Sequence, residues 1–391
     1  MANDFTQSLI RNPDLDVDRD NTTAWNRAGS RRWGFRNIHW MNRQGLNIRA
    51  SRVLPLRTAI NRAIGMRRDV QGVMASGLFS GMIVVQGRDI LFERYADDFG
   101  PAMPHSIQSI TKTTLTLIIG RLVADGRIDL TRLVEEFIPE IGSGYRGATV
   151  QQVLDMNVMN NFDEDYEAPY DQAVSPEGRT GYGRQEISGG WRLPPEGQET
   201  PSLREFLATI ADDGGSNAEN IMHYKSPNTD VAAWLAERVS GRDLKAWLRD
   251  ITEGAGLEHG FHMTLDHDFV PVLSGGGSLT LRDLARFGLL HARYGKGVDG
   301  VPVGDEAFLR ATMHSGGTQC LPPREHHRYH NQIYTDGTIV GHGGFAGQYL
   351  MARPDKEAVF GFFSTLENTH GSDPSYLGEV IPMAEDILAS L

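Results

Sequence analysis

The sequence predicts an α/β fold in which one antiparallel sheet is built from both chain ends, is flanked by helices, and carries an inserted, mostly helical region. Three observations predict it. Some β-type runs occur early in the chain, others occur late, and helical patterns fill the stretch between them. We expect residues 1–165 and 270–391 to form the α/β domain, with an N-terminal extension over 1–70. Residues 166–269 should form a helical and loop domain.

The early elements begin with the N-terminal extension. Its segment WNRAGSRRWGFRNIHWMNRQG is rich in Arg, Asn and Trp, and we expect short helices that wrap the body. Residues 81–95, GMIVVQGRDILFERY, are two β-type runs around the polar QGRD, which is typical of a hairpin. Residues 109–125 have the length and spacing of a helix that ends at DG. Residues 130–155 predict helices separated by a loop, with Thr149 as a helix N-cap.

The middle of the chain changes character at residues 157–200. This stretch is aromatic, Gly-rich and Pro-rich with little periodicity, which predicts an ordered loop at a binding site. Helices are then expected over TPSLREFLATIAD and NTDVAAWLAERVSGRDLKAWLRDI. The segment GGGSLTLRDLARFG predicts a Gly turn, a Ser or Thr cap and another helix. Near the end, VGHGGFAGQYLMARPDKEAVFGFFST predicts two β runs joined by RPDKE, and PMAEDILASL a closing helix.

Composition and charge disfavour several classes of partner. The net charge of −12 makes nucleic acid and anionic membranes unfavourable partners. No run of 18 apolar residues occurs, so no transmembrane helix is expected. The start, MANDFTQSLIRNPDLDVDRD, lacks the basic and apolar regions of a secretory signal. The single cysteine, Cys320, leaves no internal disulfide. We expect a cytoplasmic protein that acts on a small molecule, and leave a homodimer open.

The first chemical motif is Ser109-Ile110-Thr111-Lys112 at the start of an apolar helix. Residues three apart on a helix share one face. A serine hydroxyl needs a base within hydrogen-bond reach to act as a nucleophile, and a lysine can be that base if burial lowers its pKa. The pair therefore suggests a nucleophile and its base. The same pattern also occurs by chance on helix surfaces, so it decides nothing alone.

Two further motifs lie downstream. Tyr224 precedes Ser226 at a loop-to-helix junction, where a phenol can pass a proton to a leaving group if nearby lysines lower its pKa; a packing tyrosine is the alternative. The glycine-rich GHGGFAGQ, residues 341–348, could lend a backbone N–H from Phe345 to an oxyanion hole, with the Ser109 N–H as second donor. The alternative for this stretch is a tight turn before a hairpin.

Together the three motifs resemble the penicillin-recognising serine hydrolase superfamily, which includes class C type β-lactamases, D-peptidases and related esterases. There, S-x-x-K is followed by Y-x-N or Y-x-S and then by K-T-G or H/W-G-G. The segments RRWGFRN, LVADGRID, VLDMNVMNNFDEDYEAP and YKSPNTDVAAWLAERVSG also resemble the 6-aminohexanoate-dimer hydrolases, over nearly the whole chain. The resemblance implies a β-lactamase/transpeptidase-like fold with the active site between the two domains.

The resemblance also implies roles for individual residues. Ser109 would be the acylated nucleophile, Lys112 its base and Tyr224 the proton relay. The remaining residues that it implies are the oxyanion donors Ser109 and Phe345 and the substrate-binding residues Tyr166, Ser226, His342, Gly343 and Gly344. No cofactor or metal is implied. The third motif reads H-G-G and not K-T-G, which argues against efficient β-lactamase action.

The expected reaction is hydrolysis of an ester or linear amide through a Ser109 acyl-enzyme. A D-amino-acid amidase or peptidase, an acyltransferase of the same fold, and a non-catalytic acyl-binding protein stay open. The histidines of REHHRYH, His326, His327 and His330, lack metal-site spacing and predict a solvated loop or strand entry. The carboxylates of NNFDEDYE, residues 160–167, could bind a cation or a substrate amine, but a solvated loop is favoured.

Overall fold

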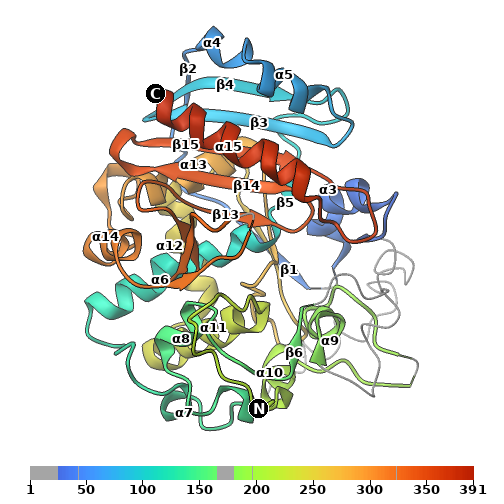
Figure 1. The fold of residues 1–391 in the computed structure, drawn as a ribbon, viewed down its shortest axis with the longest axis vertical. Coiled ribbons are helices and arrows are strands. Elements are labelled where there is room, and N and C mark those ends of the chain that lie inside the picture. Colours follow the sequence, from blue (N-terminus) through green and yellow to red (C-terminus); the bar gives the residue numbers. More distant parts are fainter. Residues whose placement is uncertain (1–24, 43, 165–179, 196, 323) are drawn as a thin grey trace.

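The computed structural model describes residues 25–391 apart from 43, 165–179, 196 and 323. Its main sheet takes strands from both ends of the chain, as predicted (Figure 1). Neighbouring strands are antiparallel except for the parallel pair β2 and β4 at one edge. In order across the sheet, the strands are β10 (Thr318–Gln319), β11 (Arg328–His330), β12 (Ile333–Thr335), β13 (Val340–Gly344), β14 (Gln348–Arg353), β15 (Ala358–Ser364), β3 (Phe79–Gln86), β4 (Asp89–Tyr95) and β2 (Arg57–Thr58).

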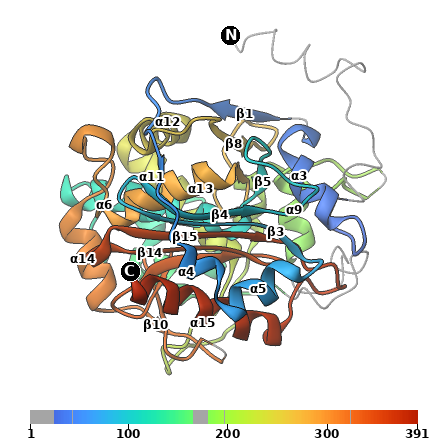
Figure 2. The same cartoon turned by 90° about the horizontal axis from the view of Figure 1, so that it is seen from above.

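The two faces of this sheet bury separate hydrophobic cores. Side chains of a strand alternate between faces, so Ile83 and Val85 of β3 join one core while Met82 and Val84 join the other. Helix α13 (Leu281–Ala292) covers the first face. The second is covered by α15 (Pro374–Ser390) and α5 (Arg68–Ala75), beside the short α4 (Arg62–Gly65). Figure 2 shows the sheet between these two helical layers.

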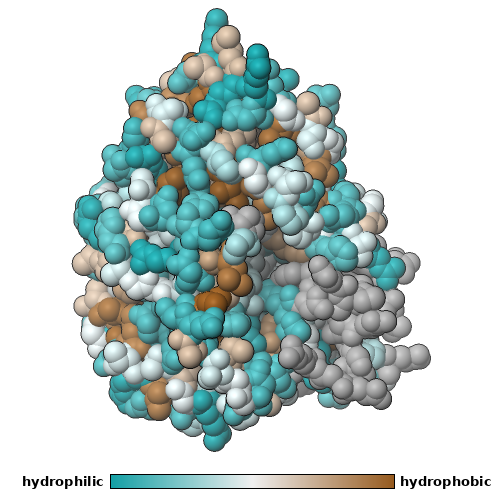
Figure 3. Space-filling model, viewed as in Figure 1, coloured by the Kyte–Doolittle hydropathy of each residue, from teal (hydrophilic) through white to brown (hydrophobic). Residues whose placement is uncertain are grey.

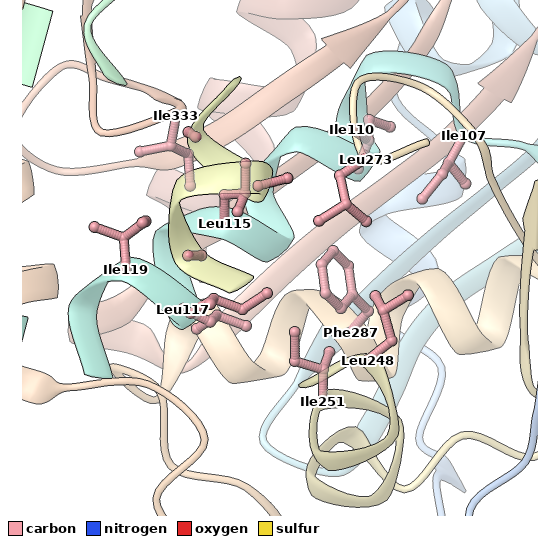
Figure 4. Close-up of a cluster of buried hydrophobic side chains, with 14 of the residues drawn as sticks. Ile107, Ile110, Leu115, Leu117, Ile119, Leu248, Ile251, Leu273, Phe287 and Ile333 are labelled. Carbon is pink, nitrogen blue, oxygen red and sulfur yellow. The ribbon is translucent and has the colours of Figure 1, made fainter. Parts of the chain in front are cut away.

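Helix α6 (Thr113–Ala124) runs through the centre of the molecule and carries the first motif at its start. A 3-10 turn, η2 (Gln108–Lys112), precedes it. The residues of α6 from Thr113 to Gly120 are buried, so this helix is enclosed on all sides, as its apolar sequence predicts. Leu115, Leu117 and Ile119 pack among side chains from several elements (Figure 4). The first motif therefore stands on a rigid support.

A second, four-stranded sheet has the order β1 (Gly45–Ile48), β8 (Phe261–Thr264), β9 (Gly277–Leu279) and β5 (His105–Ser106). In this sheet β8, from the segment 166–269 that was expected to be helices and loops, pairs with β1 and β9. Both of these strands lie in the ranges expected for the α/β domain. The division into 1–165 with 270–391 and 166–269 stays a prediction.

Most other helices lie between the two groups of strands in the sequence. They are α7 (Val134–Phe137), η3 (Ser143–Tyr145), α8 (Val150–Leu154), α9 (Tyr182–Ser188), α10 (Leu203–Thr209), α11 (Ser226–Ser240) and α12 (Leu244–Ala255). Among them lies a small sheet of β6 (Phe162–Asp163) and β7 (Thr180–Gly181). The remaining elements are α3 (Arg31–Met41), η4 (Val298–Gly300), α14 (Glu306–His314) and η5 (Pro354–Lys356). No helix in these described ranges is long and apolar enough to cross a membrane.

Two details differ from the sequence-based expectation. The stretch 157–200, expected as a loop, contains helix α9, whose residues Gln185 to Ser188 are buried; burial in the fold stabilises this helix without an amphipathic pattern. The segment 340–364 holds three strands and not two. Three glycines among its five residues give β13 little intrinsic strand preference, and pairing with β12 and β14 makes it a strand. On the face of the molecule that Figure 1 presents, polar residues cover most of the surface (Figure 3).

Candidate active site

Ser109 and Lys112 face each other on η2. The Lys112 Nζ lies 3.1 Å from the Ser109 Oγ. In a 3-10 turn, side chains at i and i+3 are eclipsed, which brings this pair together more directly than an α-helix would. Gln108, just before the serine, has a φ of 46°, in the left-handed region that non-glycine residues seldom occupy. Such strain clusters at functional sites, so the backbone supports a special role for Ser109.

Lys112 is fully buried and has three oxygen neighbours. Besides Ser109, its Nζ contacts the Ser226 Oγ at 3.0 Å and the Ser274 carbonyl oxygen. Burial lowers the pKa of Lys112 from 10.5 to about 8, while the charges of Glu164 and Asp230 act in the opposite direction. The low pKa expected from the apolar helix start is therefore present. A substantial fraction of this amine is neutral near pH 8.

When Lys112 is neutral, the partners of its oxygen neighbours decide where its two N–H bonds point. The Ser226 Oγ donates to Glu164 at 2.7 Å, because a carboxylate only accepts, and so it accepts from Lys112. The Ser274 carbonyl also only accepts. A neutral amine has two N–H bonds and one lone pair. Both N–H bonds are used by Ser226 and Ser274, and the lone pair then faces the Ser109 hydroxyl.

Tyr224 lies beside this pair at the entrance of α11. The Lys112 Nζ is 5.1 Å from the centre of its ring. The buried Tyr224 Oη makes no direct hydrogen bond to a described residue, although it lies close enough to the Ser109 hydroxyl to be influenced by it. The condition set from the sequence, that nearby lysines lower the pKa of this phenol, is not met. Burial, together with the charge of Glu164, raises the pKa of Tyr224 well above 10, although the Ser109 hydroxyl acts the other way. Tyr224 therefore stays a neutral phenol.

The third motif forms β13 and the turn after it. Phe345 follows the strand directly and lines the same cavity as Ser109. His342 is buried, its Nδ1 donates to the Gly343 carbonyl at 2.6 Å, and its Nε2 accepts from the Tyr329 hydroxyl at 3.2 Å. Burial and the nearby Lys112 charge lower the pKa of His342 well below 6.5. At the position of the family's lysine, this chain thus has an uncharged ring.

A cavity of about 630 Å³ connects the three motifs. Ser109, Tyr224, Gly343, Gly344 and Phe345 all line it, so the structure brings together residues far apart in the sequence. Ser226 lies in an adjoining small cavity that Ser109 also lines. Tyr166, expected to bind substrate, lies outside the described residues.

Several residues of the site were not singled out from the sequence. Glu164 was expected in a solvated loop, but its carboxylate accepts from the Ser226 N–H at 2.5 Å as well as from the hydroxyl. Asp230 holds Ser274 in place by accepting from its N–H at 3.1 Å, and it also accepts from Gln185. The only sequence signal for these contacts was the acidic run around Glu164. The contacts of Ser274 depend on the tertiary fold.

The histidines of REHHRYH divide into two groups. The Nε2 atoms of His326 and His327 lie 3.2 and 3.3 Å from the Glu385 Oε1, and these three residues could hold a metal ion. His327 is buried, because it packs toward α15, and it directly precedes strand β11. His330 lies on β11, where its Nδ1 is 3.1 Å from the Thr312 carbonyl oxygen. The expectation was a solvated loop or a strand entry: the exposed His326 fits the loop, and His327 and His330 lie at the entry and in strand β11.

Comparison with known proteins decides the family. The model of the family described as Beta-lactamase matches residues 66–379. The chain belongs to this family. A 6-aminohexanoate-dimer hydrolase from Paenarthrobacter ureafaciens is 30% identical over 286 residues, which cover 72% of this chain and 70% of that protein. The chain is therefore a serine hydrolase with a β-lactamase-like fold, as the sequence predicts.

Solved structures with the same fold are known. One from Bacillus anthracis, which carries the provisional name 6-aminohexanoate-dimer hydrolase, has a TM-score of 0.76 at 20% identity and covers 94% of this chain and 96% of its own. A D-stereospecific amidohydrolase from Streptomyces sp. has a TM-score of 0.57 at 18% identity, covering 82% and 99%. At these identities the likeness shows the common fold.

Proposed function

We propose that this enzyme hydrolyses a carboxylic ester or a linear amide through an acyl-enzyme on Ser109. The observation that carries the proposal is the position of the Lys112 Nζ among three oxygen atoms, those of the Ser109 and Ser226 hydroxyls and of the Ser274 carbonyl. When the amine is neutral, its two N–H bonds donate to Ser226 and Ser274, and its lone pair is left for the Ser109 hydroxyl 3.1 Å away. That is the arrangement a general base needs before a serine attacks a carbonyl carbon.

The first half-reaction transfers one proton and forms one bond. Lys112 takes the Ser109 proton as the Oγ attacks the substrate carbonyl, and the carbonyl oxygen becomes an oxyanion. The N–H groups of Ser109 and Phe345 are proposed to hold this oxyanion, since both residues line the cavity at the start of η2 and the end of β13. Donors of this kind contribute roughly 10²–10³ in rate.

Collapse of the intermediate requires a proton on the leaving group. Tyr224 is the proposed relay, because its neutral hydroxyl is otherwise unpaired beside Lys112. The phenol gives its proton to the departing alkoxide or amine and regains one from the Lys112 ammonium, so it need not exist as a free phenolate. Water then attacks the acyl-enzyme with the same groups in reversed roles. Ser226, His342, Gly343 and Gly344 are proposed to line the bound substrate.

Esters should be screened before amides, because an alkoxide is a better leaving group than an amine. The names of two relatives, a 6-aminohexanoate-dimer hydrolase and a D-stereospecific amidohydrolase, favour linear amides as the second class to screen. Another related structure belongs to a hydrolase with promiscuous acyltransferase activity. Partition of the acyl-enzyme between water and an added alcohol separates hydrolysis from acyl transfer.

The pH dependence of kcat/KM tests the assignment of Lys112 as base. Only the neutral amine accepts the proton, so the neutral fraction and the rate rise together as pH rises through the Lys112 pKa of about 8. We expect kcat/KM for p-nitrophenyl butyrate to increase roughly tenfold per pH unit below about pH 7 and to level off above about pH 9. The surface variant Lys296→Ala should keep this profile. A flat profile from pH 5 to 9 would refute the assignment.

A further inference from the structure

Arg324 extends toward the active site from the turn between β10 and β11. Its N–H donates to the Leu321 carbonyl at 3.0 Å, and its own carbonyl accepts from the His327 N–H at 2.9 Å, which fixes the turn. The guanidinium carbon lies 4.6 Å from the centre of the Tyr334 ring and 5.9 Å from that of Tyr349. These two rings hold the guanidinium by cation–π contact.

Held between these rings, Arg324 stands in the wall of the cavity that contains Ser109. Arg324 lines this cavity together with Ser109 and Tyr224. It also reaches across the third motif, because a Cβ placed on Gly343 would lie 2.9 Å from the Arg324 Nη2. The missing side chain at Gly343 thus makes room for the guanidinium. A glycine in a strand often marks such a close approach.

The guanidinium has no anionic partner in the part of the chain that the structure describes. No Asp or Glu carboxylate forms an ion pair with Arg324 there, whereas the buried Arg286 pairs with both Asp283 and Glu258. The carboxylate on the cavity wall, Glu164, is bonded to Ser226 instead. A charge that is partly withdrawn from water is costly unless an opposite charge compensates it. The cavity wall therefore carries a positively charged group that an anionic ligand would stabilise.

We propose that Arg324 binds a carboxylate of the substrate, so that the preferred substrates are esters or linear amides that carry a carboxylate away from the bond that is cleaved. The planar guanidinium can hold a carboxylate through two parallel hydrogen bonds. With an uncharged His342 at the position of the family's lysine, Arg324 supplies the positive charge beside β13 from a different element. This inference rests on the proposed hydrolase activity and names its substrate class.

The test compares matched ester pairs with and without a carboxylate. Mono-p-nitrophenyl glutarate against p-nitrophenyl butyrate places the charge on the acyl group. The pair 4-butyryloxybenzoate and its methyl ester places it on the leaving group. In Arg324→Gln we expect kcat/KM for the carboxylate member of one pair to fall roughly 10- to 100-fold, mainly through KM. The neutral member should change less than about threefold, and Arg324→Lys should recover part of the loss. Arg94→Gln, an exposed arginine of the same sheet, is the control.

Two outcomes would overturn the proposal. An equal loss for neutral and carboxylate substrates would show that Arg324 acts on the fold or on Tyr224. An unchanged kcat/KM for both carboxylate substrates would show that it contacts neither anion. If Ser109 of the wild type is acylated, but the Arg324→Gln change affects carboxylate and neutral esters alike, the hydrolase proposal stands and this inference fails. If no ester is turned over, calorimetric binding of glutarate still decides for Arg324, because tighter binding to wild type than to Arg324→Gln supports the site and equal binding removes it.

Discussion

At the scale of single residues, reactivity depends on how each proton of a buried amine is directed. Lys112 is close to Ser109 by its spacing along the chain, but spacing alone does not say which of the two groups donates. Ser226 and Ser274, which lie 114 and 162 residues further on, accept the two N–H bonds of a neutral Lys112, and its lone pair is then left for Ser109. The sequence could suggest the pair and its low pKa. It could not show the two acceptors, because their contacts form only in the folded chain.

Glu164 provides a test at this scale. Its charge raises the pKa of Lys112, and its two oxygens orient Ser226. In Glu164→Gln the lysine pKa falls further, so the rising limb of the kcat/KM profile should move to lower pH. The plateau rate should drop about tenfold, since an amide places an N–H against the Ser226 donors. The control Glu219→Gln, at an exposed position, should leave the profile unchanged. A limb that moves to higher pH would contradict this account.

At the scale of elements, the site depends on the close approach of β13 to η2. Several elements could be predicted from the sequence, because each has a local pattern. They are the hairpin of β3 and β4, the hairpin of β14 and β15, the helix α6 and the Thr149 cap. Strand β13 could not be resolved as a third strand. Its glycines allow other backbone segments to approach closely, and they give no alternation of apolar and polar side chains from which a strand could be predicted.

Gly344 tests this approach. A Cβ at this position would lie 2.7 Å from the Ile107 carbonyl oxygen and 3.1 Å from the Gln108 Cβ, just before Ser109. Gly344→Ala must therefore separate β13 from η2. We expect the free energy of unfolding to fall by about 1–3 kcal/mol and kcat to fall roughly 10- to 100-fold, measured by urea denaturation and ester turnover.

The matched control is Gly378→Ala on α15, where an added Cβ meets nothing within 4 Å. That change should stabilise the protein by about 0.5–1 kcal/mol through helix propensity, with unchanged kcat. Equal activity of the Gly344 and Gly378 variants would show that the spacing of β13 and η2 is not critical.

At the scale of the whole molecule, the N-terminal segment supports the active site from outside. The buried Arg31 of α3 donates to the Leu366 carbonyl at 2.5 Å and to the Asn368 carbonyl at 2.8 Å, after β15. Its guanidinium also lies 5.2 Å from the centre of the Phe345 ring. The Arg-rich and Trp-rich composition predicted a segment that wraps the body. Which arginine would be buried depends on the tertiary fold.

Removal of this support should affect both stability and catalysis. In Arg31→Ala the two carbonyl groups lose their buried donor, and we expect the free energy of unfolding to fall by about 2–4 kcal/mol. The kcat should also fall, because the position of Phe345 is no longer fixed. Urea denaturation and ester turnover measure the two effects, with the exposed Arg68→Ala as control. Full stability in Arg31→Ala would show that the segment is not needed to hold the site.

The central claim is an acyl-enzyme on Ser109, and a burst experiment with p-nitrophenyl butyrate tests it most directly. Wild type and Ser109→Ala are mixed with the ester, nitrophenol release is followed on the millisecond scale, and the quenched protein is weighed intact. We predict a burst close to one equivalent and the mass gain of one butyryl group in wild type, with neither in Ser109→Ala. Acylation that persists in Ser109→Ala, or a folded wild type that shows neither burst nor mass gain, would contradict the claim.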